Sequence, residues 1–416
     1  MNVVMVGTFW FPQGAASGAR VRNLALGLGR CGARVHVITL VPQPAVDGRE
    51  PASGVQDYQG ISWEGVAPTV AAVSGWRDAD RTIPRLRKGL GDRVRWFAGL
   101  YAATPRACRR IAELIERRAC DLVFVYDRSA VRMTPLARLC RARNVPALLD
   151  VTEASEHIHN RMSPIYWDFA VGTRATPRLF DGLTVITTGL AALYRKRGCP
   201  RAIVVPSIEE WPPAPPPPPT GRAEFRLTYV GALRPRDAPE LLLEAVRRVA
   251  GRGLPVTLDL IGHYDGTARG AELARRCAAE PVLGRIVRLR GSVSDAALAR
   301  ELASSDGLVL TRRDAPTEVL SFPTRLVEYL RHGRPVLVSD VGDVSRYLRH
   351  GEDAVLLHPR DPGRAAEAIA ALVSLPDRGA GIGRRGREAG RMSFDREAHA
   401  ARVLEFAEAL GARRAA

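Results

Sequence analysis

The stretch AIVVPSIEEWPPAPPPPPTGRAEFRLTYVG (202–231) places a proline-rich segment between two apolar runs. AIVVP (202–206) and FRLTYVG (225–231) are short and rich in aliphatic residues, which is typical of buried strands. Proline lacks a backbone N–H and blocks helix interiors, so WPPAPPPPPT (211–220) predicts a stiff linker. The chain therefore divides into a part before residue 211, a linker at 211–222 and a part that starts at 223.

Similar apolar runs recur on both sides of the linker. Before it they are VVMVG (3–7), RVHVITL (34–40), LVFVY (122–126), PALLDV (146–151) and GLTVIT (182–187). After it they are VTLDLIG (256–262), RIVRLRG (285–291), DGLVLT (306–311), PVLVSD (335–340) and DAVLLH (353–358). Patterns of helical period separate most of them, and a repeated strand–helix order implies a parallel sheet covered on both faces.

We therefore predict an α/β fold with two Rossmann-like doubly wound domains that face each other across a ligand cleft. The first domain is expected at 1–210 and the second at 223–390. The segment 391–416 is expected to form a helix that crosses back to the first domain.

The composition is that of a globular protein of 416 residues, with 46% hydrophobic and 25% charged residues. No apolar run approaches the ~20 residues that span a bilayer. The N-terminus reads as a core strand rather than a signal peptide. The six cysteines include no CxxC pair, as expected for reduced cytosolic thiols. We expect a cytoplasmic protein without a metal site.

The net charge of +17 favours anionic partners such as phosphorylated substrates or anionic lipid. No run of five or six consecutive basic residues occurs, so a nucleic-acid partner is not expected. The segment 76–110 combines arginines with aromatic residues, and a helix of this kind can lie on a membrane surface. The alternative is a surface helix that packs on its own domain.

The block SFPTRLVEYLRHGRPVLVSDVGDVSRYL (321–348) resembles the donor-binding segment of glycosyltransferase family 4, retaining enzymes of the two-Rossmann GT-B type. Many members read P-x-K-x-x-E-Y and then G-x-P-V. The matching residues here are Pro323, Arg325, Glu328, Tyr329, Gly333, Pro335 and Val336. The resemblance covers the chain in order and implies transfer of a hexose-type unit from a nucleoside diphosphate sugar to an acceptor hydroxyl, with retained configuration.

The resemblance also implies roles within this block. Glu328 would accept the ribose hydroxyls of the donor, while the helix start at Pro323 and Thr324 would face the diphosphate beside Arg325. The alternative for Glu328 is a solvated charge on a helix. Many members carry a second glutamate eight positions earlier, where this chain has Leu320, with Glu318 nearby but out of register. The sugar contact is therefore left open.

The block YVGALRPRDAPELLLEAV (229–246) is similar to the strand and glycine loop that open the family's second domain. Gly231 would allow a tight turn. Arg236 would bind the diphosphate and neutralise charge on the leaving group, with Arg234 as a competitor. Because arginines would replace a metal ion in this role, neither a metal nor another cofactor is expected.

Two blocks of the first domain resemble the family's remaining site elements. In FWFPQGAASGARVRNLALGL (9–28), the glycine-rich loop with Gly14 and Gly18 would approach the donor or acceptor, Ser17 would cap the helix, and Arg20 and Arg22 would serve the same cleft. The alternative is an ordinary loop. In LLDVTEASEHIHN (148–160), Glu153 and His157 are candidate catalytic residues near the sugar or acceptor. The alternative for Glu153 is a carboxylate at a helix start.

Two other functions fit the same architecture. One is a nucleotide-sugar epimerase, and the other is a nucleotide-sugar-binding subunit without catalytic activity. For a transferase, the acceptor is expected to be a glycan, a lipid-linked molecule or a small molecule, and the sequence does not decide among them.

Overall fold

The computed structural model describes residues 1–12, 14, 16–41, 54–67, 90–153, 164–217, 223–264 and 267–415. Their contacts divide the chain into two units. The first unit comprises Met1–Ile208 together with Arg396–Ala416, and the second comprises Glu209–Asp395.

The first unit is built on an eight-stranded sheet of order β3-β4-β2-β1-β5-β6-β7-β8. The strands are β1 Asn2–Gly7, β2 Arg34–Thr39, β3 Gln56–Tyr58, β4 Ile61–Gly65, β5 Leu122–Tyr126, β6 Ala147–Val151, β7 Gly182–Val185 and β8 Ala202–Val204. All neighbours pair in parallel except β3 and β4. The run β4-β2-β1-β5-β6-β7 has the Rossmann strand order, in which β1 and β5 flank the switch point.

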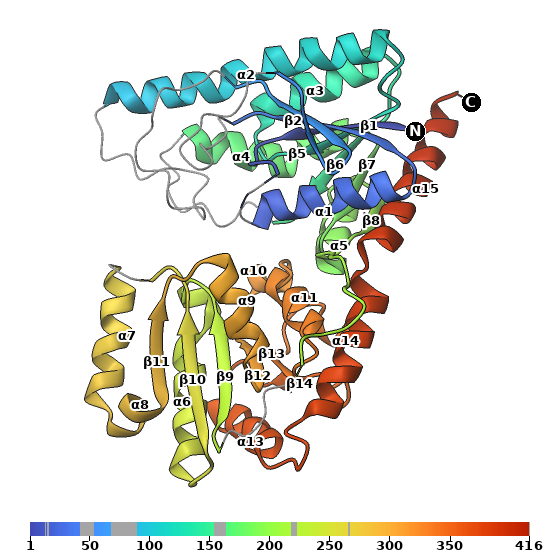
Figure 1. Ribbon diagram of the computed structural model, residues 1–416. Helices are drawn as coiled ribbons and strands as arrows, with labels where there is room; N and C mark the ends of the chain where they lie inside the picture. Colours follow the sequence, from blue (N-terminus) through green and yellow to red (C-terminus); the bar gives the residue numbers. More distant parts are fainter. Residues whose placement is uncertain are drawn as a thin grey trace. The chain divides into compact units, whose positions relative to one another are not determined.

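Helices cover both faces of this sheet. They are α1 Ala16–Arg30, α2 Leu90–Glu116, α3 Ala130–Ala142, α4 Pro164–Arg174, η2 Thr176–Leu179, α5 Thr188–Lys196 and α15 Arg396–Ala415. Figure 1 shows α2 and α3 on one side of the sheet and α1 and α15 on the other. The last helix, α15, packs closely on α1, because a Cβ on Gly27 would lie 2.7 Å from the Arg396 carbonyl oxygen.

The second unit has a six-stranded parallel sheet of order β11-β10-β9-β12-β13-β14, again the Rossmann order. The strands are β9 Phe225–Val230, β10 Val256–Ile261, β11 Val287–Gly291, β12 Gly307–Leu310, β13 Val336–Ser339 and β14 Val355–Leu357. The helices are η3 Pro235–Asp237, α6 Pro239–Gly251, α7 Ala268–Ala279, α8 Pro281–Ile286, α9 Asp295–Ala303, α10 Pro316–Val319, α11 Thr324–Arg331, α12 Val344–Tyr347, α13 Pro362–Val373 and α14 Ala380–Phe394.

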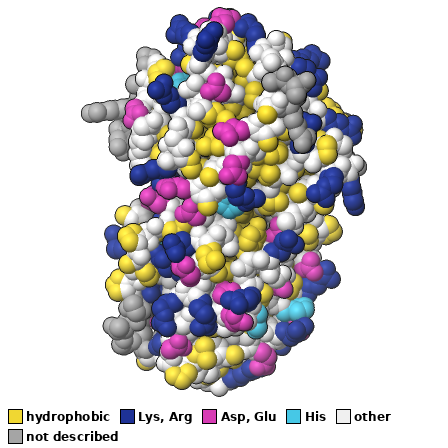
Figure 2. Space-filling view, turned by 90° about the vertical axis from the view of Figure 1, so that its right-hand side faces the viewer, with side chains coloured by type: hydrophobic (Ala, Val, Ile, Leu, Met, Phe, Trp, Pro, Cys, Tyr) yellow, Lys and Arg dark blue, Asp and Glu magenta, His cyan; other side chains and the backbone are white. Residues whose placement is uncertain are grey.

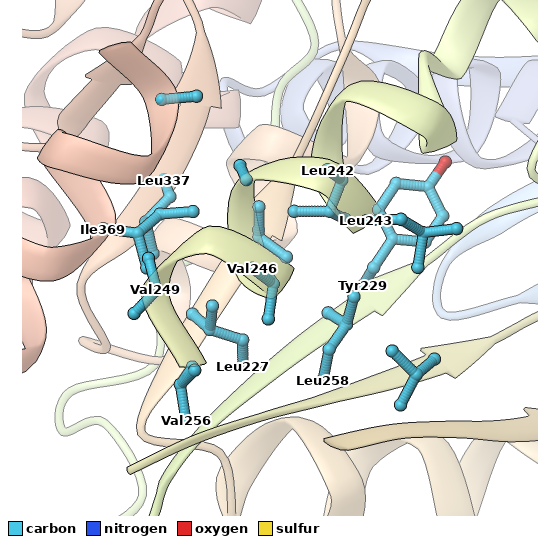
Figure 3. Close-up of a cluster of buried hydrophobic side chains, with 14 of the residues drawn as sticks. Leu227, Tyr229, Leu242, Leu243, Val246, Val249, Val256, Leu258, Leu337 and Ile369 are labelled. Carbon is cyan, nitrogen blue, oxygen red and sulfur yellow. The ribbon is translucent and has the colours of Figure 1, made fainter. Parts of the chain in front are cut away.

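The core of the second unit forms where α6 lies on β9 and β10. Leu242, Val246 and Val249 recur at helical spacing on α6 and are fully buried, with at most 1% of each exposed. Figure 3 shows these side chains above Leu227 of β9 and Leu258 of β10. Each such side chain contributes about 1.5–3 kcal/mol by leaving water, so this layer fixes the strand ends that carry the site.

The described part of the proline-rich segment is docked on the second unit instead of forming a free spacer. The Arg334 guanidinium donates to the carbonyl oxygens of Pro216 and Pro217, and that of Arg387 donates to Pro212. Arg387 also lies over the Trp211 ring, at 5.9 Å from its centroid. Residues 218–222 of the predicted linker lie outside the described residues.

Every apolar run named above forms a strand, and two further strands were not predicted. β3 and β4 form an antiparallel hairpin at one edge of the first sheet, where polar residues interrupt the apolar pattern. The basic segment 76–110 is described only from residue 90, where α2 begins, so Arg77, Arg81, Arg85 and Arg87 lie outside the described residues.

Candidate functional site

The switch point of the second sheet lies between β9 and β12, where the strand order reverses. Ligands of doubly wound sheets bind beyond the carboxyl ends of such strands. Two hydrogen bonds join the loops that follow β9 and β12. The Thr311 hydroxyl donates to the Asp237 carbonyl oxygen at 2.6 Å, and the Arg313 backbone N–H donates to that of Arg236 at 2.9 Å.

The loop after β9 has an unusual backbone that fixes the place of Arg236. Leu233 and Ala238 have φ values of 50° and 47°, in the left-handed region that side chains other than glycine rarely adopt. The two residues bracket η3, which carries Arg236, and both are buried. A strained loop held by its surroundings is typical of binding sites.

Gly231 is required for space rather than for a positive φ. Its φ is not in the left-handed region, and a Cβ at this position would lie 2.5 Å from the Tyr229 hydroxyl. Its carbonyl oxygen also lies against Gly262, where a Cβ would approach it to 1.9 Å. The predicted tight turn is therefore a close packing of strand ends.

A cluster of charges occupies the space beside these loops. Glu318 of α10 is only 4% exposed, and its Oε2 accepts a hydrogen bond from Arg312 Nη1 at 2.9 Å. Arg236 Nε lies 3.9 Å from the same oxygen and 3.9 Å from Asp237 Oδ1. Burial, and then the nearby Arg236 charge, lower the pKa of Arg312 below its usual value. Sequence reasoning missed Arg312, although its position directly after β12 could have indicated it.

The block around Glu328 forms α11, which begins at Thr324. Pro323 is the buried residue before the helix and Thr324 is exposed. Arg325 Nη1 donates to Glu328 Oε2 at 2.8 Å, an i,i+3 ion pair in which both side chains are about one-third exposed. Burial acts to lower the pKa of Arg325, but Glu328 outweighs burial and the net pKa is raised.

Tyr329 joins α11 to β9, the strand that leads into the loop that carries Arg236. Its side chain is fully buried, and its hydroxyl accepts a hydrogen bond from the Val230 backbone N–H at 2.8 Å. This bond connects α11 to the end of β9, the strand that leads to Gly231 and Arg236. The block with Pro323, Thr324, Arg325 and Glu328 lies at and within the start of that helix.

In the first unit, Arg20 is part of the framework. It is 8% exposed, and its guanidinium forms a fork with the Asp150 carboxylate through bonds of 2.6 and 2.8 Å. It also donates to the carbonyl oxygens of Pro206 and Val205. The expectation that Arg20 serves a ligand cleft conflicts with this use of its donors, because the side chain joins α1, β6 and the segment after β8.

The loop before α1 also differs from the expectation. The helix begins at Ala16, so Ser17 is its second residue and not its N-cap. Gly18 is buried and Gly14 is exposed. A Cβ on Gly14 would lie 2.9 Å from the Trp10 carbonyl oxygen, so this glycine permits a close backbone approach.

The other predicted residues of this unit follow β6. Glu153 is about one-third exposed, and its Oε2 accepts a hydrogen bond from Arg128 Nη1 at 2.9 Å. The Arg128 guanidinium lies 5.5 Å from the centre of the Phe169 ring. His157 lies outside the described residues.

A buried cluster at the switch point of the first sheet was not predicted. Asp127, directly after β5, accepts hydrogen bonds from the Thr8 hydroxyl and from Arg132 Nε and Nη2. Burial would raise the pKa of Asp127, but the Arg132 charge outweighs burial and the pKa is lowered. The cluster links the ends of β1 and β5 to α3.

Three findings bear on metals, membranes and charge. In the part of the chain that the structure describes, no group of His, Cys, Asp or Glu side chains could hold a metal ion. None of the described helices has both the length and the apolar composition needed to cross a bilayer. On the face shown in Figure 2, Lys and Arg side chains are interspersed with Asp and Glu side chains.

Comparison with known proteins gives matches to a family model, to related sequences and to solved structures. Residues 224–374 match the family model described as "Glycosyl transferases group 1". D-inositol 3-phosphate glycosyltransferase from Thermobispora bispora is 31% identical over 191 residues, which are 44% of this chain and 43% of that protein. The chain thus matches less than half the length of this relative.

A longer match is to the GDP-mannose-dependent alpha-(1-6)-phosphatidylinositol monomannoside mannosyltransferase from Mycobacterium tuberculosis. It is 25% identical over 379 residues, which are 85% of this chain and 94% of that protein.

Among solved structures, sucrose-phosphate synthase from Thermosynechococcus elongatus has a TM-score of 0.68 at 17% identity and covers 99% of this chain and 100% of its own. Anabaena HepE in complex with UDP has a TM-score of 0.65 at 14% identity and covers 98% of this chain and 100% of its own. At these identities the likeness shows the fold, which is the two-Rossmann-domain fold of GT-B glycosyltransferases.

Proposed function

We propose that this protein is a glycosyltransferase that moves a sugar from a nucleoside diphosphate sugar to an acceptor hydroxyl, with retained configuration. The observation that carries the proposal is the match of residues 224–374 to the glycosyltransferase family model, because this range contains the arginine and glutamate cluster at the sheet switch point. Both named curated relatives are glycosyl- or mannosyltransferases.

In the proposed reaction, the bond between the sugar C1 and the diphosphate oxygen breaks, and the acceptor oxygen bonds to C1 and loses its proton. The leaving diphosphate gains negative charge. Among the described residues, no acceptor takes a hydrogen bond from the Arg236 guanidinium, so its donors are available for these phosphates. This neutralisation would serve in place of a metal ion.

Glu328 is proposed to hold the donor ribose. Its ion pair with Arg325 uses Oε2, which leaves Oε1 to accept ribose hydroxyls. The hydrogen bond between Tyr329 and Val230 then fixes the helix of this carboxylate against the strand that leads to Arg236. Glu153 and His157 remain proposed contacts of the sugar or acceptor in the first unit.

A phosphorylated acceptor agrees best with the net charge of +17. The names of both curated relatives describe acceptors that contain inositol and phosphate. We propose an acceptor of this class, either a small molecule or a lipid. A cytoplasmic location is proposed for either acceptor, and an anionic membrane surface is a further proposed partner if the acceptor is a lipid.

The test is donor turnover by the purified chain against a panel of UDP-, GDP- and ADP-sugars, with and without inositol 3-phosphate or a phosphatidylinositol mannoside. The expected result is release of one nucleoside diphosphate per sugar transferred, and proton NMR of the product should show the anomeric configuration of the donor. An epimerised donor sugar without transfer would indicate an epimerase. Donor binding without turnover for any pair would indicate a binding subunit.

A further inference from the structure

Arg312 and Arg236 come from different strand ends and share one carboxylate. Arg312 follows β12 and Arg236 lies in the loop after β9. Glu318 Oε2 lies 2.9 Å from Arg312 Nη1 and 3.9 Å from Arg236 Nε. The two cations therefore share one buried carboxylate, and the Asp237 carboxylate lies 3.9 Å from Arg236 Nε.

The unused donors of Arg312 show that its guanidinium is only partly engaged. Arg312 Nη1 donates two hydrogen bonds, one to Glu318 Oε2 and one to the Ser321 hydroxyl at 2.6 Å. Among the described residues, Nε and Nη2 donate to no protein acceptor. A planar guanidinium held through one terminal nitrogen can offer its other donors to an anion such as a phosphate.

The backbone holds the two arginines in register. The Arg312 N–H donates to the Ser339 hydroxyl at the end of β13, at 3.0 Å. On the other side, the hydrogen bonds from Thr311 and Arg313 pin the loop that carries Arg236. Neither arginine can move far from the other without breaking these contacts.

We infer that Arg312 and Arg236 together bind the diphosphate of the donor, and that Glu318 is the positioning residue that holds the two guanidinium groups. The inference rests on the proposed function for the identity of the anion. It gives a role to a carboxylate that is out of register with the family's usual first glutamate. Glu318 touches the arginines and acts on the donor only through them.

The direction in which Glu318→Gln changes anion affinity shows whether Glu318 positions the arginines or only adds negative charge beside them. Glu318→Gln removes the negative charge beside two cations, which by electrostatics alone should tighten the binding of an anion. If the carboxylate holds the arginines in place, the same substitution should weaken that binding, because Arg312 loses its ion pair. We expect pyrophosphate affinity to fall about fivefold or more in Glu318→Gln.

The probe is inorganic pyrophosphate, titrated calorimetrically into the full chain, because it needs no assumption about the base or the sugar. Arg312→Gln should weaken pyrophosphate binding about ten- to a hundredfold. In the Arg312→Gln background, Glu318→Gln should have little further effect, since a residue that acts through Arg312 has lost its target. Arg313→Gln is the matched control, because it removes the same charge from an exposed neighbour and should change affinity by less than about twofold. Far-UV circular dichroism and thermal melting confirm that each variant is folded.

Wild-type pyrophosphate affinity in Arg312→Gln would overturn the two-cation site. Tighter binding in Glu318→Gln, or an equal effect of Glu318→Gln in both backgrounds, would overturn the positioning role. A failure of the proposed function alone would give a different set of results. A wild type that binds pyrophosphate through Arg312 but never turns over a sugar donor would exclude the transferase and leave the cation pair intact.

Discussion

Replacing Arg20 by methionine tests whether this arginine supports the fold or binds a ligand. In the structure its guanidinium makes four hydrogen bonds, two to Asp150 and one each to the carbonyl oxygens of Pro206 and Val205. Arg20→Met keeps most of the buried side-chain volume but removes all four bonds.

The expected cost follows from what stays behind. The Asp150 side chain is only 1% exposed and would keep one side-chain donor, the Thr184 hydroxyl at 2.6 Å. Removing one partner of a buried ion pair typically costs about 3–5 kcal/mol, because the other charge remains buried and uncompensated. This is a large share of the ~5–15 kcal/mol that stabilises a typical domain.

Hydrogen exchange measured by mass spectrometry is the suitable assay, because it reports on the first unit separately. Peptides covering β6 and β8 should lose about two to four orders of magnitude of protection in Arg20→Met. Adding Asp150→Asn should recover part of the loss, since the double variant has no stranded charge. Arg22→Met is the matched control on the same helix, because Arg22 is half-buried and its guanidinium makes one hydrogen bond among the described residues, to the Pro12 carbonyl oxygen at 3.3 Å. Its expected cost is below about 1 kcal/mol.

Unchanged protection in Arg20→Met, together with weaker binding of donor or acceptor, would refute this reasoning. Such a result would support the original expectation that Arg20 serves the ligand cleft. Full protection in Arg20→Met with normal binding would show that the Arg20–Asp150 ion pair contributes nothing measurable to stability, and this result would contradict the argument from its burial.

Four further predictions concern the second unit. Glu328→Gln should lower turnover about a hundredfold or more while the melting temperature stays within ~2 °C of wild type, and near-normal turnover would exclude a ribose contact. Arg236→Ala should weaken nucleoside diphosphate binding about ten- to a hundredfold in calorimetric titrations and leave free nucleoside binding nearly unchanged. Transfer should continue in EDTA, because arginines are proposed to neutralise the diphosphate, and activity that stops and returns with magnesium would contradict this. Burial, followed by the Arg331 and Arg334 charges, lowers the pKa of His332 to about 4. As pH falls from 6.5 the unfolded chain binds this proton first, so the wild type should lose stability between pH 6.5 and 4, and His332→Asn should show a flatter melting-temperature profile.

The strands were predictable because both sheets are largely parallel and covered on two faces. A strand in that position must be apolar on both sides, and β9 and β10 are buried along their whole lengths. The hairpin of β3 and β4 is short and lies at the sheet edge, so its polar residues carry neither a continuous run nor a clear alternation. Its pairing depends on contacts with β2 that are distant in sequence.

The site was predictable only where a motif is local. Glu328 and Tyr329 belong to one helix, and their block can be recognised as a unit. Arg312 and Glu318 belong together only through the fold of the loop after β12, and the sequence RRDAPTE (312–318) contains no spacing that indicates an ion pair. Local spacing alone is not sufficient, because Gly27, Gly29 and Gly32 have the spacing G-x-G-x-x-G but begin inside α1 instead of following a strand, and Gly27 serves close packing against α15.

The two ends of β9 show why arginine content alone does not locate a binding site. Near the amino end, Arg226 donates through Nε and Nη2 to Asp259 and through Nη1 to the Ser304 hydroxyl, and Glu301 is a further partner. At the carboxyl end, the Arg236 guanidinium has two carboxylates at 3.9 Å, beyond hydrogen-bonding distance. A protein with so many arginines must neutralise those that it buries, and Arg226 and Arg20 are neutralised in this way. The engaged arginines hold the framework, so an added anion gains most at the carboxyl end of β9, where the Arg236 guanidinium and Nε and Nη2 of Arg312 donate to no acceptor among the described residues.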